Sequence, residues 1–217
     1  MRVVAVVLLA LALVGCGGGL ERSVARECSK VSQPAASRRS EHAPVANLDA
    51  ATTYDVVMRT NCGTFTIRID PLRFPHAAAS FVSLTEAGYF DRTIFTRVVP
   101  GVLVQAGDPT ATGRGGPGYT TVDAPPAGAS YDHGVVAMAK TKTQPPGTAG
   151  SQFFIVTAKK AKLRPQYAIV GKVVKGIDVV DLIGMLGGGS DLPSQVQHVS
   201  DAPTQVVEIE HAMVVTT

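Results

Sequence analysis

Residues 95–108 read FTRVVPGVLVQAGD, and residues 150–157 read GSQFFIVT. Polar donors stand among strand-forming apolar residues in both segments: Arg97 and Gln105 in the first, and Gln152 beside Phe154 in the second. A charged or amide side chain is costly to place in an apolar environment unless it has hydrogen-bond partners. The two segments therefore predict a polar site set in an apolar, aromatic-walled hollow.

The sequence on either side predicts many short strands and two helices. Phe65, Ile67 and Ile69 alternate with polar residues, which indicates a strand with one buried face. Pro75 suits the first turn of a helix and Gly88 its end. Further strands are expected at 54–60, 95–99, 102–105, 135–139, 153–157, 168–174 and 206–215, and a second helix at 177–183. Many short strands with two helices favour a mainly β fold, a closed β-barrel with helical ends.

Together, the two opening segments resemble the motifs of the cyclophilin-type peptidyl-prolyl cis-trans isomerases, and the resemblance covers roughly residues 52–215. It implies a closed eight-stranded antiparallel β-barrel capped by two α-helices, in an isomerase domain at residues 52–217. It also implies an enzyme that accelerates rotation about X–Pro bonds, with no cofactor and no metal. The expected partners are proline-containing polypeptides, here exported proteins that are unfolded or folding, and the expected state is a monomer.

The resemblance assigns catalytic roles to Arg97, Gln105 and Phe154. Resonance gives the peptide C–N bond a rotational barrier of about 18–20 kcal/mol. A donor that stabilises only the twisted amide lowers this barrier, and a permanently charged guanidinium with several fixed N–H groups suits that role. The residues that the resemblance places against the substrate are Val102, Leu103, Ala139, Lys140, Gln152, Leu163 and Tyr167. Of these, Ala139 and Gln152 match the groove for the residues that precede the proline.

Several positions depart from the family's usual pattern. Val102 stands where a phenylalanine usually walls the proline pocket, and Lys162 stands where an aromatic residue helps to bind cyclosporin. Lys140 replaces a common asparagine, and Tyr167 replaces a common histidine. These changes leave Arg97 in place but weaken the expected grip on proline. Two functions therefore remain open: an active isomerase, or a binding module or chaperone that uses the same groove with little turnover.

The N-terminal residues predict an exported, lipid-anchored protein. Residues 3–14 form an unbroken apolar run, too short for a membrane-spanning helix but suited to the core of a signal peptide. The run leads to Cys16 in a pattern that resembles a lipobox, so residues 1–15 are expected to be a lipoprotein signal peptide and Cys16 the lipidated residue. Residues 16–51 are expected to be a flexible linker. The expected location is the extracytoplasmic side of the cell membrane; an ordinary secretory peptide with an incidental cysteine is the alternative.

Composition argues against other classes of protein. Twenty Lys and Arg against 17 Asp and Glu give a net charge of +3, with the basic residues scattered, which does not indicate nucleic-acid binding. The five histidines and three cysteines show no metal-ligand spacing. Once Cys16 is lipidated, Cys28 and Cys62 remain as a pair, and either a disulfide or two free thiols stays open.

Two short motifs are discounted. Residues 113–118 match G-x-G-x-x-G by letter, but Pro117, Pro125 and Pro126 preclude the helix that a dinucleotide site requires, so a glycine-rich surface loop is expected. His133 follows an aspartate, but no serine stands in a nucleophile-elbow pattern, and a hydrolase triad therefore has little support.

Overall fold

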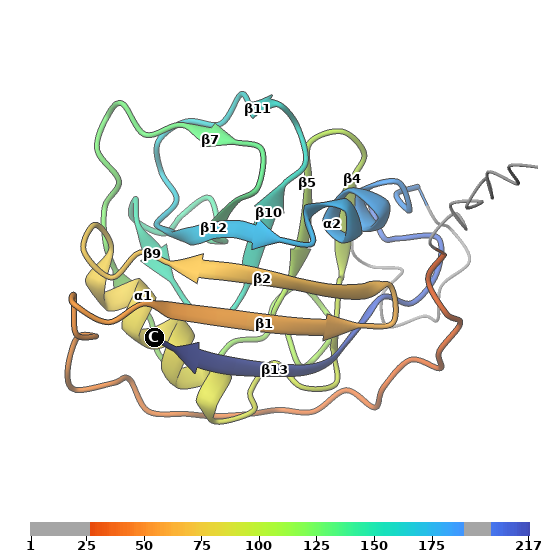
Figure 1. Ribbon diagram of the computed structural model, residues 1–217, viewed down its shortest axis with the longest axis horizontal. Coiled ribbons are helices and arrows are strands. Elements are labelled where there is room, and N and C mark those ends of the chain that lie inside the picture. Colours follow the sequence, from red (N-terminus) through yellow and green to blue (C-terminus); the bar gives the residue numbers. More distant parts are fainter. Residues whose placement is uncertain (1–26, 189–200) are drawn as a thin grey trace, which may run out of the picture.

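A computed structural model of the chain describes residues 27–188 and 201–217 (Figure 1). Its helices are α1 (Pro75–Glu86) and α2 (Ile177–Gly184). Its strands are β1 (Tyr54–Thr60), β2 (Gly63–Ile69), β3 (Thr93–Ile94), β4 (Arg97–Val99), β5 (Leu103–Ala106), β6 (Thr121–Val122), β7 (Tyr131–Asp132), β8 (Val135–Met138), β9 (Thr148–Ala149), β10 (Phe153–Val156), β11 (Lys160–Ala161), β12 (Ile169–Lys175) and β13 (Glu208–Thr216). The mainly β fold with two helices is confirmed, and most of these elements lie within two residues of their predicted positions.

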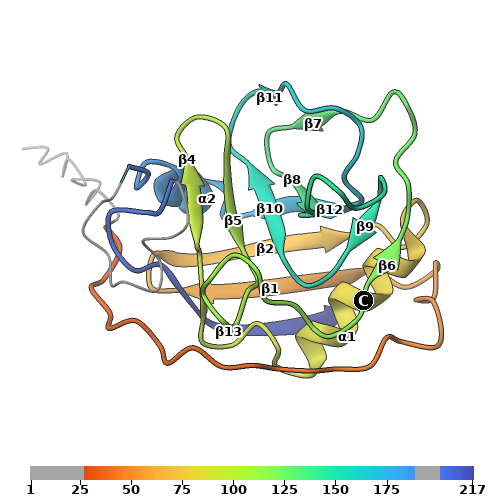
Figure 2. The same ribbon diagram turned by 180° about the vertical axis from the view of Figure 1, so that it is seen from behind.

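Nine strands form one curled antiparallel sheet in the order β3-β13-β1-β2-β12-β8-β10-β5-β4 (Figures 1 and 2). The first long strand, β1, lies between β2 and the last strand, β13, with Tyr54 opposite Thr216. The expected closed eight-stranded barrel is therefore wrong in both strand number and closure. Within the described residues, β3 and β4 end the strand order on opposite sides, and no ladder joins them.

The two ends of the sheet meet at the chain between β3 and β4, where an isolated bridge pairs Ile94 with Asp108. Phe95 donates its backbone N–H to the carbonyl of Val207, beside β13, at 2.8 Å. The next residue, Thr96, donates to the carbonyl of Gln105 on β5 at 3.0 Å. Two successive residues thus bond to opposite ends of the sheet, so the covalent chain itself crosses the seam where a closed barrel would have a ladder.

The two helices cover different parts of the sheet. α1 packs against β1, β12 and β13, and α2 packs against β2, β4 and β5. Pro75 opens α1 as predicted, and the carboxylate of Asp123 accepts the backbone N–H of Ala77 at 2.7 Å, which satisfies one free donor of the first turn. α2 follows Gly176, whose φ of 71° and close approach to Thr64 leave no room for a Cβ atom.

The main core lies inside the curled sheet, and aromatic rings fill it. Phe81 of α1, Phe90 and Phe153 of β10 have no exposed surface. The ring of Phe153 lies 5.2 Å from that of Phe81 and 5.6 Å from that of Phe90, both in edge-to-face geometry. A smaller apolar cluster, which borders the site described below, contains Leu103, Tyr131, Ala137, Phe154, Val156 and Ala161.

One strand departs from its predicted pattern of buried and exposed residues. Val207 and Ile209 are buried as the alternation predicts, but Glu208 between them is only 2% exposed. Arg92 reaches it from outside, with Nη1 2.6 Å from Oε1. Burial raises the pKa of the Glu208 carboxyl, and the neighbouring guanidinium opposes that shift.

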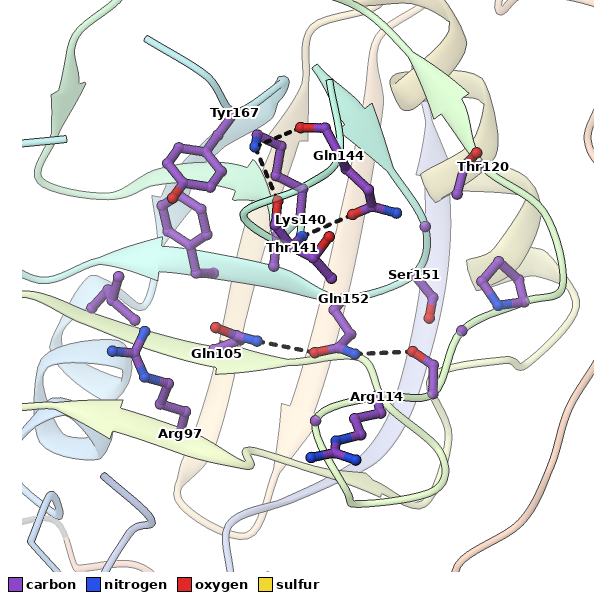
Figure 3. A pocket seen from close by; sticks show the side chains of 18 of the residues that line it. Arg97, Gln105, Arg114, Thr120, Lys140, Thr141, Gln144, Ser151, Gln152 and Tyr167 are labelled. Atoms are coloured by element: carbon purple, nitrogen blue, oxygen red, sulfur yellow. Dashed lines mark hydrogen bonds between the residues drawn. The ribbon is translucent and has the colours of Figure 1, made fainter. Parts of the chain in front are cut away.

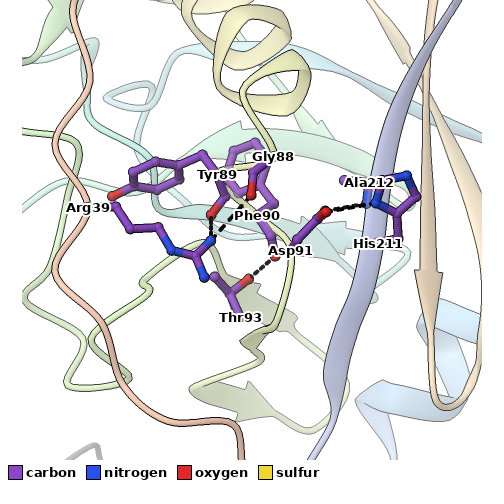
Figure 4. A network of polar contacts seen from close by, with 8 residues as sticks. All are labelled: Arg39, Gly88, Tyr89, Phe90, Asp91, Thr93, His211 and Ala212. Atoms are coloured by element: carbon purple, nitrogen blue, oxygen red, sulfur yellow. Dashed lines mark hydrogen bonds and ion pairs between the residues drawn. The ribbon is translucent and has the colours of Figure 1, made fainter.

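Residues 28–51, here called the strap, follow the outside of the domain before β1 begins (Figures 1 and 2). The backbone N–H groups of Ser37 and Glu41 donate to the carbonyls of Pro109 and Pro117, both at 2.9 Å. Arg39 donates to the carbonyls of Gly88 and Tyr89 at 3.3 and 2.5 Å (Figure 4). The flexible linker that the sequence predicts for residues 16–51 includes the strap and stays a prediction; these polar contacts describe the path of the strap along the domain.

A disulfide joins the start of the strap to the β1–β2 turn. The sulfur atoms of Cys28 and Cys62 are 1.98 Å apart, so the structure has the bonded form of the two alternatives that the sequence leaves open. The predicted signal peptide and Cys16 lie outside the described residues. Among the residues that are described, no helix has the length and apolar character needed to cross a membrane.

Candidate functional site

An open hollow of about 930 Å³ lies over β5 and β10. All ten residues that the sequence predicts for catalysis and substrate binding line it: Arg97, Val102, Leu103, Gln105, Ala139, Lys140, Gln152, Phe154, Leu163 and Tyr167. They come from three strands of the sheet and the loops between them, because the pairing of β5 with both β4 and β10 brings the two sequence motifs together. The structure thus brings all ten together; the role of each remains a prediction.

The polar side of the hollow is a chain of amide hydrogen bonds (Figure 3). Arg97 on β4 pairs in register with Gln105 on β5. Gln105 Nε2 donates to Gln152 Oε1 at 3.0 Å, and Gln152 Nε2 donates to the carbonyl of Gly115 at 2.9 Å. Because the Gly115 carbonyl can only accept, it fixes the orientation of the Gln152 amide. Within the part of the chain that the structure describes, the side-chain carbonyl oxygen of Gln105 has no hydrogen-bond partner and can accept a hydrogen bond from a ligand.

Arg97 has a partner that the sequence analysis missed. Its Nε and Nη2 donate to Asp201 Oδ2 at 3.3 and 3.2 Å. The two side chains are 36% and 43% exposed, so water screens the pair. Asp201 takes the Nε edge of the guanidinium and, among the described residues, leaves Nη1 available to a ligand in the hollow. The two residues are 104 positions apart, and no local pattern could have indicated the contact.

The apolar side of the hollow is a group of aromatic rings. Phe154, 3% exposed, meets the ring of Tyr167 edge-to-face at 5.2 Å, and Tyr131 packs behind both. The Tyr131 hydroxyl donates to the Tyr167 carbonyl at 2.9 Å and accepts the Tyr167 backbone N–H at 3.0 Å. Burial raises the pKa of Tyr131, so the hydroxyl keeps its proton for this contact. Tyr131 was not singled out in the sequence, although its double contact holds Tyr167 in place.

The residues that depart from the family's pattern have different positions relative to the hollow. Val102 lies in the β4–β5 turn and packs, half-buried, beside Leu103 and Leu163. Lys140 Nζ donates to the carbonyls of Thr141 and Gln144 at 3.1 and 3.0 Å and lies 5.9 Å from the ring centre of Tyr167. Its charge is therefore directed onto its own loop.

A loop wall that the sequence analysis treated as ordinary surface closes one end of the hollow. The carboxylate of Asp108, which is fully buried, accepts the backbone N–H groups of Thr110, Thr112, Arg114 and Gly115 at 2.8–3.1 Å. A Cβ atom on Gly115 would lie 2.0 Å from Asp108 Oδ1, so only glycine allows this approach. The signal that could have revealed the loop is Asp108 itself, an acid two residues after the end of the buried strand β5.

No group of three or more His, Cys, Asp or Glu side chains in the described part of the chain could hold a metal ion. What these residues offer is a cationic donor, an oriented amide and an aromatic floor around one solvent-open volume. Such an arrangement can bind a small apolar ring while it directs hydrogen bonds at an adjacent polar group.

Comparison with known proteins gives consistent matches. The family model described as cyclophilin-type peptidyl-prolyl cis-trans isomerase matches residues 55–214. A peptidyl-prolyl cis-trans isomerase-like 1 of Aspergillus fumigatus is 35% identical over 165 residues, which are 74% of this chain and 95% of that protein. A peptidyl-prolyl cis-trans isomerase of Arabidopsis thaliana is 37% identical over 131 residues, which are 59% of this chain and 81% of that protein.

Solved structures agree with the sequence matches. The crystal structure of a Cryptosporidium parvum cyclophilin-type isomerase superposes with a TM-score of 0.65 at 28% identity, covering 75% of this chain and 98% of that one. A second crystal structure of that protein, obtained in the presence of the dipeptide Ala-Pro, gives a TM-score of 0.64 at 28% identity, covering 74% of this chain and 98% of that one.

Proposed function

This chain belongs to the cyclophilin-type peptidyl-prolyl cis-trans isomerase family, and from that premise we propose that its hollow catalyses rotation about X–Pro bonds in exported proteins. The observation that carries the proposal is the pairing of Arg97 with Gln105 on adjacent strands beside a floor formed by Phe154. A guanidinium, an amide and an apolar ring pocket are the groups that this reaction requires within one volume.

The mechanism follows from the electronic change during rotation. Twisting the X–Pro bond removes amide resonance and returns a lone pair to the prolyl nitrogen. A donor directed at that nitrogen, or at the prolyl carbonyl, stabilises the twisted state more than either planar state and so lowers the barrier. The Nη1 edge of Arg97 is the part of the guanidinium that Asp201 leaves free for this role.

Binding of the proline ring falls to the apolar side. The pyrrolidine ring loses its contact with water against an apolar surface formed by Phe154, Leu103, Leu163 and Val102. Gln105, oriented by Gln152, accepts a backbone N–H of the substrate on one side of the rotating bond. Holding one side of the bond while the other turns converts binding into catalysis.

The test is an isomerisation assay on a short proline peptide, coupled to a protease that cleaves only the trans form. The wild-type chain is expected to accelerate the reaction in proportion to its concentration. A rate equal to the uncatalysed rate, together with measurable binding of the same peptide, would replace this proposal with the second candidate.

That second candidate is a binding module or chaperone with little turnover. Val102 favours it, since valine gives less wall area than an aromatic residue and weakens the grip on the proline ring. Substituting Val102→Phe separates the two cases. If weak binding of the proline ring limits turnover, Val102→Phe lowers KM. If the chain only binds, Val102→Phe binds proline peptides more tightly and still does not catalyse their isomerisation.

The cellular setting rests on the N-terminal sequence and on the disulfide. Cys16 ends an apolar run of signal-peptide type, and a bond between Cys28 and Cys62 is typical of oxidising compartments outside the cytosol. The apolar run with Cys16 supports a lipid anchor, and the disulfide supports a location outside the cytosol, where the substrates would be exported chains. Expression with labelled palmitate tests the anchor: wild type should incorporate label and Cys16→Ala should not. Absence of label from wild type would remove the anchor and leave the isomerase unaffected.

A further inference from the structure

A second open hollow, of about 1310 Å³, lies on the other side of the Asp108 loop and involves the strap. Its lining residues are Ala36, Ser37, Arg38, Arg39, Thr110, Thr112, Arg114, Gly115, Gly116 and Gly118. Four of them, from Arg114 to Gly118, also line the first hollow. The two hollows therefore share a wall.

The second hollow is cationic. Three guanidinium groups line it, and Arg39 is fixed by the carbonyls of Gly88 and Tyr89 (Figure 4). Within residues 27–188 and 201–217, Arg39 forms no ion pair with a carboxylate. Arg38 and Arg114 are exposed, and neither has a carboxylate within ion-pair distance among residues 27–188 and 201–217. Their charges are therefore available to a ligand.

The acids near this hollow offset only part of that charge. Asp108 lies beneath the loop, but its two oxygens are already occupied by four backbone N–H groups and the Thr110 hydroxyl. Glu41 follows on the strap, where its backbone N–H bonds to the Pro117 carbonyl, and its side chain does not line the hollow. Three cations against these two acids leave the surface with a positive balance.

Both walls of the second hollow are held in place before any ligand arrives. The Asp108 carboxylate organises the loop that carries Arg114. The strap that carries Arg38 is fixed on either side, by the Ser37–Pro109 backbone bond and by the contacts of Arg39. The backbone of both walls therefore needs little ordering on binding, which lowers one of the costs of association.

We propose that the second hollow is a subsite for acidic residues upstream of the proline in the polypeptide substrate, with Arg38 and Arg114 as specificity-determining cations. The inference rests on the proposed function, in which Ala139 and Gln152 bind the residues that precede the proline. Gln152 bonds directly to Gly115 in the shared wall. A substrate chain that continues upstream past Gln152 thus crosses the loop and reaches the two arginines.

The test uses synthetic peptides with one proline and otherwise neutral residues, in which a single glutamate moves one position at a time, upstream and then downstream of the proline. Isomerisation is measured by NMR exchange, which needs no coupling protease. Each residue of extended chain advances about 3.3 Å, so the glutamate samples the path in steps. We expect kcat/KM to peak at one or two upstream positions and to stay flat downstream.

Variants then assign the peak to the arginines. Arg38→Ala and Arg114→Ala should each lower kcat/KM for the best acidic peptide about 2- to 5-fold and leave the neutral peptide unchanged, and salt should reduce the preference. Arg59→Ala on β1, an exposed arginine outside both hollows, is the matched control and should change neither. Arg38→Glu should transfer the preference from glutamate to lysine at the same position.

Other outcomes overturn the proposal. An equal gain from glutamate placed downstream would show general attraction by the positive surface without a subsite. A flat profile with normal turnover of the neutral peptide would remove the subsite and leave the isomerase intact. If wild type turns over no peptide at all, including the neutral one, the proposed function itself fails and the subsite fails with it.

Discussion

Phe153 and Phe154 are neighbours on β10 and lie on opposite faces of the sheet. Phe153 packs into the main core, where the rings of Phe81 and Phe90 surround it. Phe154 faces the hollow, where Tyr167 and Tyr131 contact it from one side and water has access from the other. Both are nearly fully buried, at 0% and 3% exposure. Exposure alone therefore does not distinguish a core ring from a site ring.

The difference lies in what holds each ring in place. On the core face, apolar side chains hold one another, and the sheet and α1 supply the walls. On the hollow face, a thin apolar cluster is held by polar contacts: the Tyr131 hydroxyl fixes Tyr167, and an amide chain fixes Gln105. The core face accordingly contributes most to the stability of the fold, and the hollow face positions the groups of the site. Substitutions on the core face should therefore lower stability, and substitutions on the hollow face should lower activity.

The largest effect is expected from truncating the core ring. Phe153→Ala should lower the free energy of unfolding by about 3–5 kcal/mol, because it removes buried aromatic surface and leaves a cavity. Phe154→Ala should cost no more than the low end of that range, since water can enter the space, but it should raise KM for proline peptides. Urea denaturation of both variants, with assays at a temperature where both are folded, checks this. Equal losses of stability would contradict the division between the two faces.

The next effect is on activity alone. Arg97→Ala should lower kcat/KM on the order of 10²–10³-fold, the range for loss of one preorganised donor, while the urea midpoint stays near that of wild type. Arg97→Lys should recover little, since an ammonium lacks the planar fork of a guanidinium. Full activity in Arg97→Ala would exclude the proposed mechanism even if the fold is unchanged.

A smaller effect is expected at the partner of Arg97. Asp201→Asn should lower kcat by no more than about 5-fold, the equivalent of a solvent-exposed ion pair, because Asp201 positions the guanidinium without touching the substrate. KM and stability should stay near the wild-type values, and the effect should vanish in an Arg97→Ala background. An increase in kcat would show instead that Asp201 competes with the substrate for Arg97.

The smallest effect is expected at Glu208, whose carboxylate is buried, in contrast to the exposed pair of Arg97 and Asp201. The folded-state pKa of Glu208 is raised by burial. The contribution of Glu208 to stability is therefore fully present when the pH is below the pKa of an ordinary glutamate, about 4.3. It is lost as the pH rises through the pKa of Glu208 in the folded state. Glu208→Gln removes this loss, so its stability relative to wild type should be higher at pH 7 than at pH 4. Urea curves at the two pH values measure the change, and an opposite sign would mean that the Arg92 pair outweighs burial.

Sequence patterns located the site better than its surroundings. Periodicity predicted β2 and α1, because one buried face imposes a regular spacing on the residues, and β-rich composition predicted β1. The ten residues that family resemblance predicts for the site all line one hollow, and their roles stay predictions. The misses share a physical cause: the Arg97–Asp201 contact joins residues far apart in the chain, and the buried Glu208 depends on Arg92 reaching it from another element. No local spacing encodes such contacts.

Closure of the sheet was mispredicted for a related reason. Whether a curled sheet closes is decided at its last seam, and here that seam depends on the opposite bonding directions of Phe95 and Thr96. Neither residue is unusual for a strand, so the composition of the segment does not indicate whether the sheet closes. A count of short strands predicts a mainly β architecture, but it does not predict whether the two end strands of the sheet pair with each other.

The pairing of β1 with β13 has a consequence for how the chain acquires its fold. Tyr54 and Thr216, which lie opposite each other in this ladder, are separated by about 160 residues of chain. During synthesis β1 therefore emerges long before its partner exists, and one edge of the β1–β2 hairpin stays unpaired until the C-terminal residues arrive. Ladders between such distant segments fold slowly, since the entropy of closing the loop is lost before the contacts form. Completion of the sheet, and with it of the hollow, is a late event in the life of the nascent chain.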